Sequence, residues 1–379
     1  MSMVDDVLGM GRTSSIFEGA IEPELEEITM ESATDIPSYM DPMEFMTQVA
    51  CEQELNMQRL DMAILAEEYV YLRENGVEMV EESAVDTALG LVKKCQEGIM
   101  RVWEKIQSFF KMVQTKLREA DKRDELFVKV YKEKAIAGGT VKVKVNSIIS
   151  SSDLNTINAN AKSFYQKTIK AANDIYVGAR TNTSESKDLV AEALRTIFGD
   201  KVTDQNSTAK AILKQMVKDA KDTKGKDSTV DVELNPDTAC KEFLTAKDLK
   251  IDLKNSYNHS KKIINTLLKS AKGIEGTLKK KKVLPTDESK KVHQSVKAIS
   301  AVQKILVQTN KTEVKLFNMR KAMLKKIILA SAAQGSKKIG KGAAVSKDIS
   351  DKTEKYGGAA NIQLNSASLI ESVQFGEEW

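Results

Sequence analysis

The sequence predicts a mainly α-helical protein with a small β element, and three observations lead to this prediction. Only 5% of the 379 residues are aromatic and only 5 are proline, a composition that favours helices over β-sandwiches and barrels. A heptad-like apolar pattern runs over residues 85–117, as in the long helix of a coiled coil or bundle. Alternating apolar residues occupy short runs near 140–146 and 228–253, which is typical of short strands.

Residues 1–42 are predicted to form an acidic extended arm, because their apolar periodicity is weak and prolines interrupt them. A helix is expected to begin where Asp41 supplies an N-cap and Pro42 the first helical position. It opens a long-helix region over 43–137, a coiled coil or bundle, which ends before Gly138 and Gly139.

An apolar seam is the strongest pattern of this region. Its members are Val85, Leu89, Val92, Ile99, Trp103, Ile106, Phe110, Val113 and Leu117. Steps of four and three residues keep these side chains on one stripe of a helix. We predict that the seam serves assembly, although a heptad stripe also packs within a single chain. Gln96, the polar residue of the seam, is interpreted as lying at a wet edge.

Residues 138–253 are predicted to be a helical module with short strands. The expected strands cover 140–145, 228–234 and 249–253, and the expected helices between the first two cover about 153–175, 184–198 and 205–222. A basic helical hairpin follows over 254–333, broken near Pro285. Residues 334–379 are predicted to be a flexible tail with a terminal docking peptide, because apolar residues return only after about 369.

Charge is distributed unevenly, although the net charge is only +4. Residues 1–82 contain 20 acidic and 3 basic residues, whereas residues 254–350 contain 23 basic and 5 acidic residues. Such a basic segment attracts polyanions, and added salt weakens that attraction. The lysines that we predict to contact a polyanion are Lys279, Lys280, Lys281, Lys282, Lys325, Lys326, Lys337 and Lys338. The alternative is that these lysines are only the solvated faces of helices.

Arg320 is the one arginine of this basic segment, and aromatic residues are scarce there. The segment therefore has few side chains that could form bidentate hydrogen bonds with bases or stack on them. Any DNA contact is expected to be nonspecific and directed at phosphates. The spacing from Gly335 to Lys341 is that of a phosphate-binding loop, but Gly342 stands where a Ser or Thr would hold magnesium.

No motif of an enzyme stands out in the chain. HExxH, GxSxG and paired CxxC patterns are absent, and there are only two histidines. We therefore expect a non-enzymatic protein with no catalytic residues, no cofactor and no metal site. No apolar stretch reaches the roughly 18–20 residues of a membrane span.

The acidic arm, the long heptad helix and the lysine-rich helical body together resemble the internal or structural virion proteins of large tailed bacteriophages. The run Ile28-Thr29-Met30-Glu31-Ser32 is similar to the sites at which prohead proteases of such phages cut after glutamate. Leu369-Ile370-Glu371-Ser372 is a second such match. The resemblance implies processing after Glu31 and Glu371.

The resemblance implies a virion structural protein of the capsid or tail, present in the host cytoplasm during assembly. Its expected partners are copies of itself or other virion proteins, with DNA or acidic protein surfaces as further partners for the lysine-rich half. Two other classes fit the same sequence features: a helical secreted effector or translocator, and a nonspecific DNA-binding protein.

Overall fold

The computed structural model describes seven stretches of the chain. These are residues 41–74, 82–150, 152–178, 188–199, 208–217, 229–245 and 249–338. Helices account for 88% of the structure, and the predicted mainly α class with a small β element is confirmed. The predicted processing residues Glu31 and Glu371 lie outside the described residues, as does nearly all of the acidic arm.

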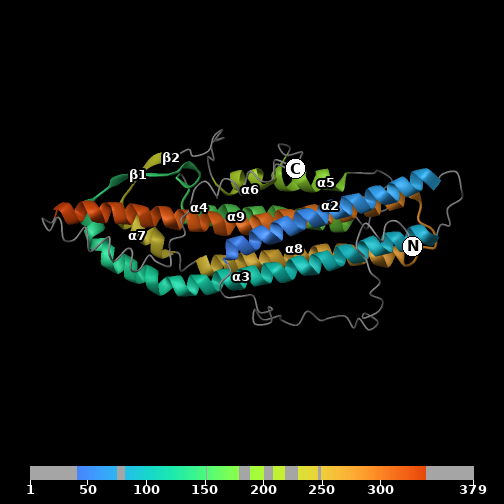
Figure 1. Cartoon of the computed structure of the whole chain (residues 1–379), viewed down its shortest axis with the longest axis horizontal. Coiled ribbons are helices and arrows are strands. Elements are labelled where there is room, and N and C mark those ends of the chain that lie inside the picture. Colours follow the sequence, from blue (N-terminus) through green and yellow to red (C-terminus); the bar gives the residue numbers. More distant parts are fainter. Residues whose placement is uncertain are drawn as a thin grey trace. The chain divides into compact units, whose positions relative to one another are not determined.

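Long and short helices follow one another along the chain (Figure 1). They are α2 (Pro42–Glu74), α3 (Glu82–Gly138), the short η2 (Ser147–Ile149), α4 (Leu154–Gly178), α5 (Leu189–Phe198), α6 (Thr208–Met216), α7 (Pro236–Thr245), α8 (Leu249–Leu278) and α9 (Thr286–Lys338). Side-chain caps fix several starts: Asp41 accepts a hydrogen bond from the backbone N–H of Met43, and Asp188 accepts one from that of Val190.

The chain divides into two compact units. Unit 1 consists of Met1–Met112, Thr168–Thr196 and Ser260–Val307, and unit 2 consists of Val113–Lys167, Ile197–His259 and Gln308–Trp379. The boundaries fall inside helices, so that α3, α4, α5, α8 and α9 each contribute a part to both units.

In unit 1 the acidic helix α2 is held by apolar burial and by ion pairs. Met46, Val49, Met57 and Ile64 are each 8% exposed or less. Three α2 carboxylates pair with lysines of α3 and α9: Glu52 with Lys105, Glu54 with Lys304 and Asp61 with Lys297. The acidic N-terminal half and the basic C-terminal half of the sequence therefore neutralise each other in part within this unit.

Unit 2 contains the β element. The strands β1 (Val141–Asn146) and β2 (Thr229–Leu234) pair antiparallel, with Val143 opposite Val232 (Figure 1). Val143 and Val145 are buried, whereas Lys142 and Lys144, which alternate with them, are exposed, as expected of a half-buried strand.

The third predicted strand, 249–253, is wrong, because these residues form the start of α8. The alternation of Leu249, Ile251 and Leu253 covers only five residues. The residues that follow it, Tyr257, Ser260, Ile264 and Leu267, are buried at helical spacing, and Leu253 belongs to the same series. A long helical pattern therefore overrides a short alternating one.

The basic hairpin is formed by α8 and α9, and the predicted start at Thr286 is correct, with Asp287 and Glu288 in the first turn. The predicted end near residue 333 is too early, because α9 continues to Lys338. Ser336 is 5% exposed, so this last turn packs against the protein. Residues 339–379, with the predicted docking peptide, lie outside the described residues.

Candidate functional site

Helix α8 buries one face in unit 1 and exposes a lysine-rich one. The buried side chains, each 5% exposed or less, are Ile263, Ile264, Leu267, Ala271, Ile274 and Leu278. Lys262, Lys269 and Lys272 are exposed on the other side, and Lys279 and Lys280 are exposed in the turn that continues the helix. Backbone hydrogen bonds from Lys279 to Glu275 and from Lys280 to Thr277 keep that turn helical.

The lysines of this face form two rows, because successive residues of an α-helix are rotated by about 100°. The first row is Lys262, Lys269 and Lys280, and the second row is Lys261, Lys272 and Lys279. At about 1.5 Å per residue, each row extends over roughly 27 Å. Uncharged Asn265 and Gly276 lie on the strip between the rows. We call these six lysines the α8 lysine face.

Little negative charge compensates the α8 lysine face. Glu275 beside the second row accepts hydrogen bonds from Lys279 at 2.8 Å and from Gln96 of α3 at 2.7 Å. These two bonds, and more weakly the charge of Lys93, lower the pKa of the Glu275 carboxyl. Among the residues that the structure describes, the other five lysines of the face form no ion pair. The face therefore carries a large excess of positive charge.

The eight lysines predicted from the sequence fall into different environments. Lys279, Lys280 and Lys282 are exposed in unit 1, but Lys281 pairs with Glu288. In unit 2, Lys325 lies over the ring of Phe127 at 5.5 Å, and Lys326 donates a hydrogen bond to the backbone oxygen of Lys144 at 2.8 Å. The side chains of Lys337 and Lys338 lie outside the described residues.

Four lysines supply most of the α8 lysine face but are not among those predicted from the sequence: Lys261, Lys262, Lys269 and Lys272. The predicted lysines are adjacent in sequence, whereas neighbours on a helix face are three, four or seven residues apart. The available signal was the regular lysine spacing over residues 261–280, with Glu275 as the single acid in that range.

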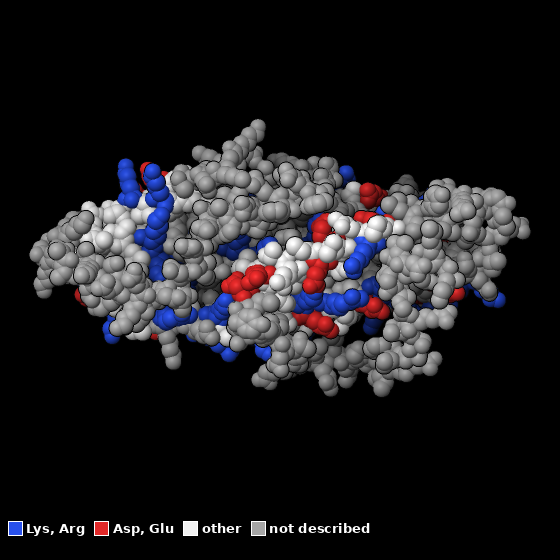
Figure 2. Space-filling model, in the orientation of Figure 1, with Lys and Arg blue, Asp and Glu red and all other residues white. Residues whose placement is uncertain are grey.

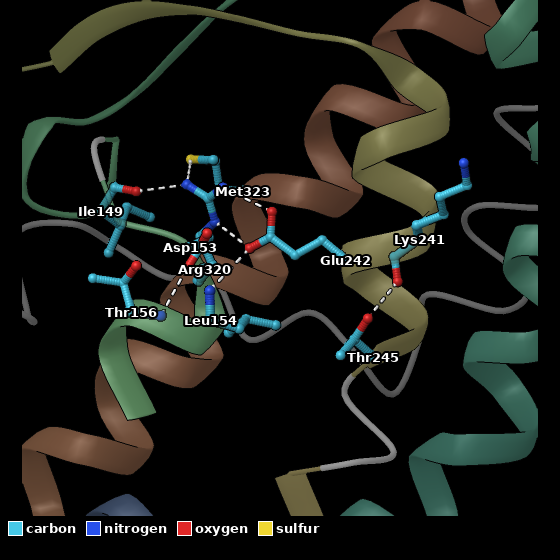
Figure 3. Close-up of polar contacts among 9 residues, drawn as sticks. All are labelled: Ile149, Asp153, Leu154, Thr156, Lys241, Glu242, Thr245, Arg320 and Met323. Atoms are coloured by element: carbon cyan, nitrogen blue, oxygen red, sulfur yellow. Dashed lines mark hydrogen bonds and ion pairs between the residues drawn. The ribbon is translucent and has the colours of Figure 1, made fainter. Parts of the chain in front are cut away.

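Arg320, in unit 2, is buried and bonded through all three of its side-chain nitrogen atoms (Figure 3). Its Nε and Nη2 atoms donate to the two carboxylate oxygens of Glu242, each at 2.8 Å, and its Nη1 donates to the backbone oxygen of Ile149 at 2.9 Å. Glu242 also accepts from the backbone N–H of Leu154 at the start of α4. This guanidinium joins α7, α9 and the η2–α4 connection, and its burial keeps it from reading bases.

A second buried polar cluster of unit 2 surrounds the carboxylate of Glu313, which is 3% exposed. Tyr165 donates to its Oε2 at 2.9 Å and Ser256 donates to its Oε1 at 2.7 Å. The ring of His259 stacks on that of Tyr165 with centroids 5.6 Å apart. The cluster ties α4, α8 and α9 together, because a buried carboxylate requires such donors.

The apolar seam of α3 lies in the interior of the chain. Val85, Val92, Ile99, Trp103, Ile106, Phe110, Val113 and Leu117 are 8% exposed or less, and Leu89 is half-buried. The seam therefore packs within the chain, which is one of the two arrangements that a heptad stripe allows, and it offers little surface to a second copy.

The run that resembles a phosphate-binding loop is helical over residues 335–338, which form the last turn of α9. A β-carbon on Gly335 would overlap the backbone oxygen of Lys134. This glycine is therefore required by helix packing, and its backbone does not form a phosphate cradle.

On the face drawn in Figure 2, acidic and basic side chains are interspersed over the described surface. No described helix is long and apolar enough to cross a membrane. The described residues also contain no cluster of three or more His, Cys, Asp or Glu suited to a metal ion. Comparison of the chain with protein-family models, curated proteins and solved structures finds no match.

Proposed function

We propose that this chain is a non-enzymatic structural protein of a tailed-bacteriophage virion that binds an extended polyanion through the α8 lysine face. The observation that carries the proposal is a set of six lysines on one helix face, of which only Lys279 pairs with a carboxylate, that of Glu275, among the residues that the structure describes. The virion context comes from the resemblance of the sequence layout to internal and structural phage proteins.

The arrangement supports a long, repeating ligand. Each lysine contributes a modest, salt-sensitive attraction, and six lysines along roughly 27 Å add up only on a ligand that presents charge over the same length. A small anion would contact two or three of them at most. Nucleic acid has such a charge density, with one phosphate per about 1.7 Å of duplex.

Assembly with copies of the chain or with other virion proteins requires a surface other than the α3 seam. The seam side chains are already buried. Unlike the buried seam, the α8 lysine face has five exposed lysines and one half-buried lysine, Lys261, so it offers surface for contact with DNA or an acidic protein.

Binding of the full chain to a fluorescent polyanion, measured by anisotropy as a function of NaCl concentration, tests the proposal. We expect log K to fall linearly with log [NaCl]. Replacing Lys262, Lys269 and Lys272 by Gln is expected to weaken binding at least about tenfold at low salt, because three of the six charges are removed.

A control variant replaces Lys142, Lys162 and Lys241, which are exposed lysines of unit 2, by Gln. It has the same net charge, so equal losses in the two triple variants would contradict a role for the α8 lysine face. Mass spectrometry of purified particles tests the virion context. Recovery with capsid or tail proteins supports it, and absence from any particle would favour a nonspecific DNA-binding protein or a secreted effector.

A further inference from the structure

The two rows of the α8 lysine face have a geometry that selects among polyanions. We infer that the ligand is double-stranded nucleic acid, bound without sequence specificity, with α8 seated along a groove. This inference rests on the proposed function, because it names the ligand class of the same surface. The uncharged strip of Asn265 and Gly276 between the rows is the structural basis of the inference.

A duplex presents two phosphate backbones, one on each side of a groove. The major groove is about 12 Å wide and accepts an α-helix, whose diameter with side chains is about 10–12 Å. A helix in that position needs cations on both flanks and none on the strip that faces the groove floor. Lys262, Lys269 and Lys280 supply one flank, and Lys261, Lys272 and Lys279 supply the other.

Gly276 leaves the centre of the strip without a side chain. It is exposed, and a β-carbon at this position would meet nothing within 4 Å. Internal packing of the chain therefore does not require glycine here, although glycine disfavours a helix interior relative to alanine. A missing side chain lets the helix backbone approach a groove closely, as glycines do at other phosphate-binding surfaces.

The face lacks the groups that other nucleic-acid ligands require. Residues 261–280 contain no aromatic side chain on which single-stranded bases could stack and no arginine for bidentate contact with guanine. Lysine contacts to phosphate remain, and these are insensitive to base sequence. A duplex of any sequence is therefore the ligand that the face fits.

Competition and direct binding with four probes test the inference on the full chain. The probes are a 20-base-pair duplex, a second duplex of unrelated sequence, the single strand of the same length and polyglutamate. We expect equal affinity for the two duplexes and at least about tenfold weaker binding of the other two. The salt slope for the duplex should approach about −5 for six lysines and should drop by about 3 in either single-row triple Gln variant.

Gly276→Leu distinguishes insertion of α8 into a duplex groove from electrostatic attraction of the lysines to any polyanion. The leucine side chain fills the strip between the rows, and all six lysines stay in place. We expect duplex affinity to fall at least about tenfold while polyglutamate binding stays unchanged, with circular dichroism as the check on folding. Unchanged duplex binding, or equal binding of single strand or polyglutamate, would overturn the inference and leave the proposed function standing. Equal losses in the row variants and the Lys142, Lys162 and Lys241 control would overturn both.

Discussion

Gly138 of α3 and Gly335 of α9 lie against each other in unit 2, so that a β-carbon on either residue would come within 2.8 Å of the backbone nitrogen of the other. The β-carbon of residue 335 would also overlap the carbonyl oxygen of Lys134. The two helices are therefore in backbone contact at this point. Only glycine at both positions allows that approach.

We predict that Gly335→Ala destabilises the protein by about 1–3 kcal/mol or more, because the helices must separate to accept the methyl group. The intrinsic helix preference for alanine opposes this effect by only about 1 kcal/mol. The midpoint of urea unfolding measures the change. Gly276→Ala is the matched control: nothing lies within 4 Å of its added methyl, so a stabilisation of about 0.5–1 kcal/mol is expected.

The Arg320–Glu242 pair gives a second prediction about unit 2. Removing one member leaves the other charge buried, since their side chains are only 6% and 14% exposed. We expect Arg320→Met and Glu242→Met each to cost about 3–5 kcal/mol. The double variant should cost clearly less than the sum of the two single variants, because neither charge remains. Additive losses in urea unfolding would show that the two residues act independently.

Some elements of this fold could be predicted from the sequence, and others could not. Thr286 at the start of α9 and the strands near 141–146 and 229–234 were predictable, because caps and alternation are local signals. The end of α9 was not, because Gly335 and Ser336 resemble a flexible segment until the contact with Lys134 is known. Local composition does not reveal which segment, distant in the sequence, packs its backbone against the end of α9.

The candidate site, like the fold, was predictable only where local sequence determines it. The lysine excess of the C-terminal half was visible in the sequence, but the distinction between free and engaged lysines was not. Lys304 and Lys297 are paired with acids of α2, more than 200 positions away in the chain. Lys269 and Lys272 are exposed without such partners in the described structure, so only tertiary structure separates the two sets.

The buried cluster around Glu313 yields a third prediction. Tyr165→Phe removes a donor from a carboxylate that is almost inaccessible to water, and it is expected to cost about 1–3 kcal/mol. Ser256→Ala removes a second hydroxyl donor and should cost a similar amount. Thr245→Ala serves as the control, because its exposed hydroxyl donates, among the described residues, only to the backbone of Lys241. Its loss is expected to change stability by at most about 0.5 kcal/mol. A Tyr165→Phe effect no larger than the control would contradict the role of the cluster.

Lys315 makes stability depend on pH in the alkaline range. Burial, together with the nearby charge of Lys311, lowers the pKa of Lys315 to about 8, whereas the ordinary value is about 10.4. Between these two values the unfolded chain binds more protons at this residue than the folded chain does. The contribution of Lys315 to stability therefore rises as the pH increases from about 8 to about 10.4, and it is lost as the pH falls through 8.

Cys95 acts in the opposite direction, because burial raises the pKa of its thiol to about 12. The unfolded thiol ionises first, so this residue lowers stability as the pH rises above about 8.5.

A comparison of wild type with Lys315→Met cancels the thiol contribution. We expect the stability advantage of Lys315→Met, measured by urea unfolding at pH 7.5 and pH 9.5, to shrink at the higher pH. A difference between the two proteins that stays constant over this range would show that Lys315 titrates normally in the folded state.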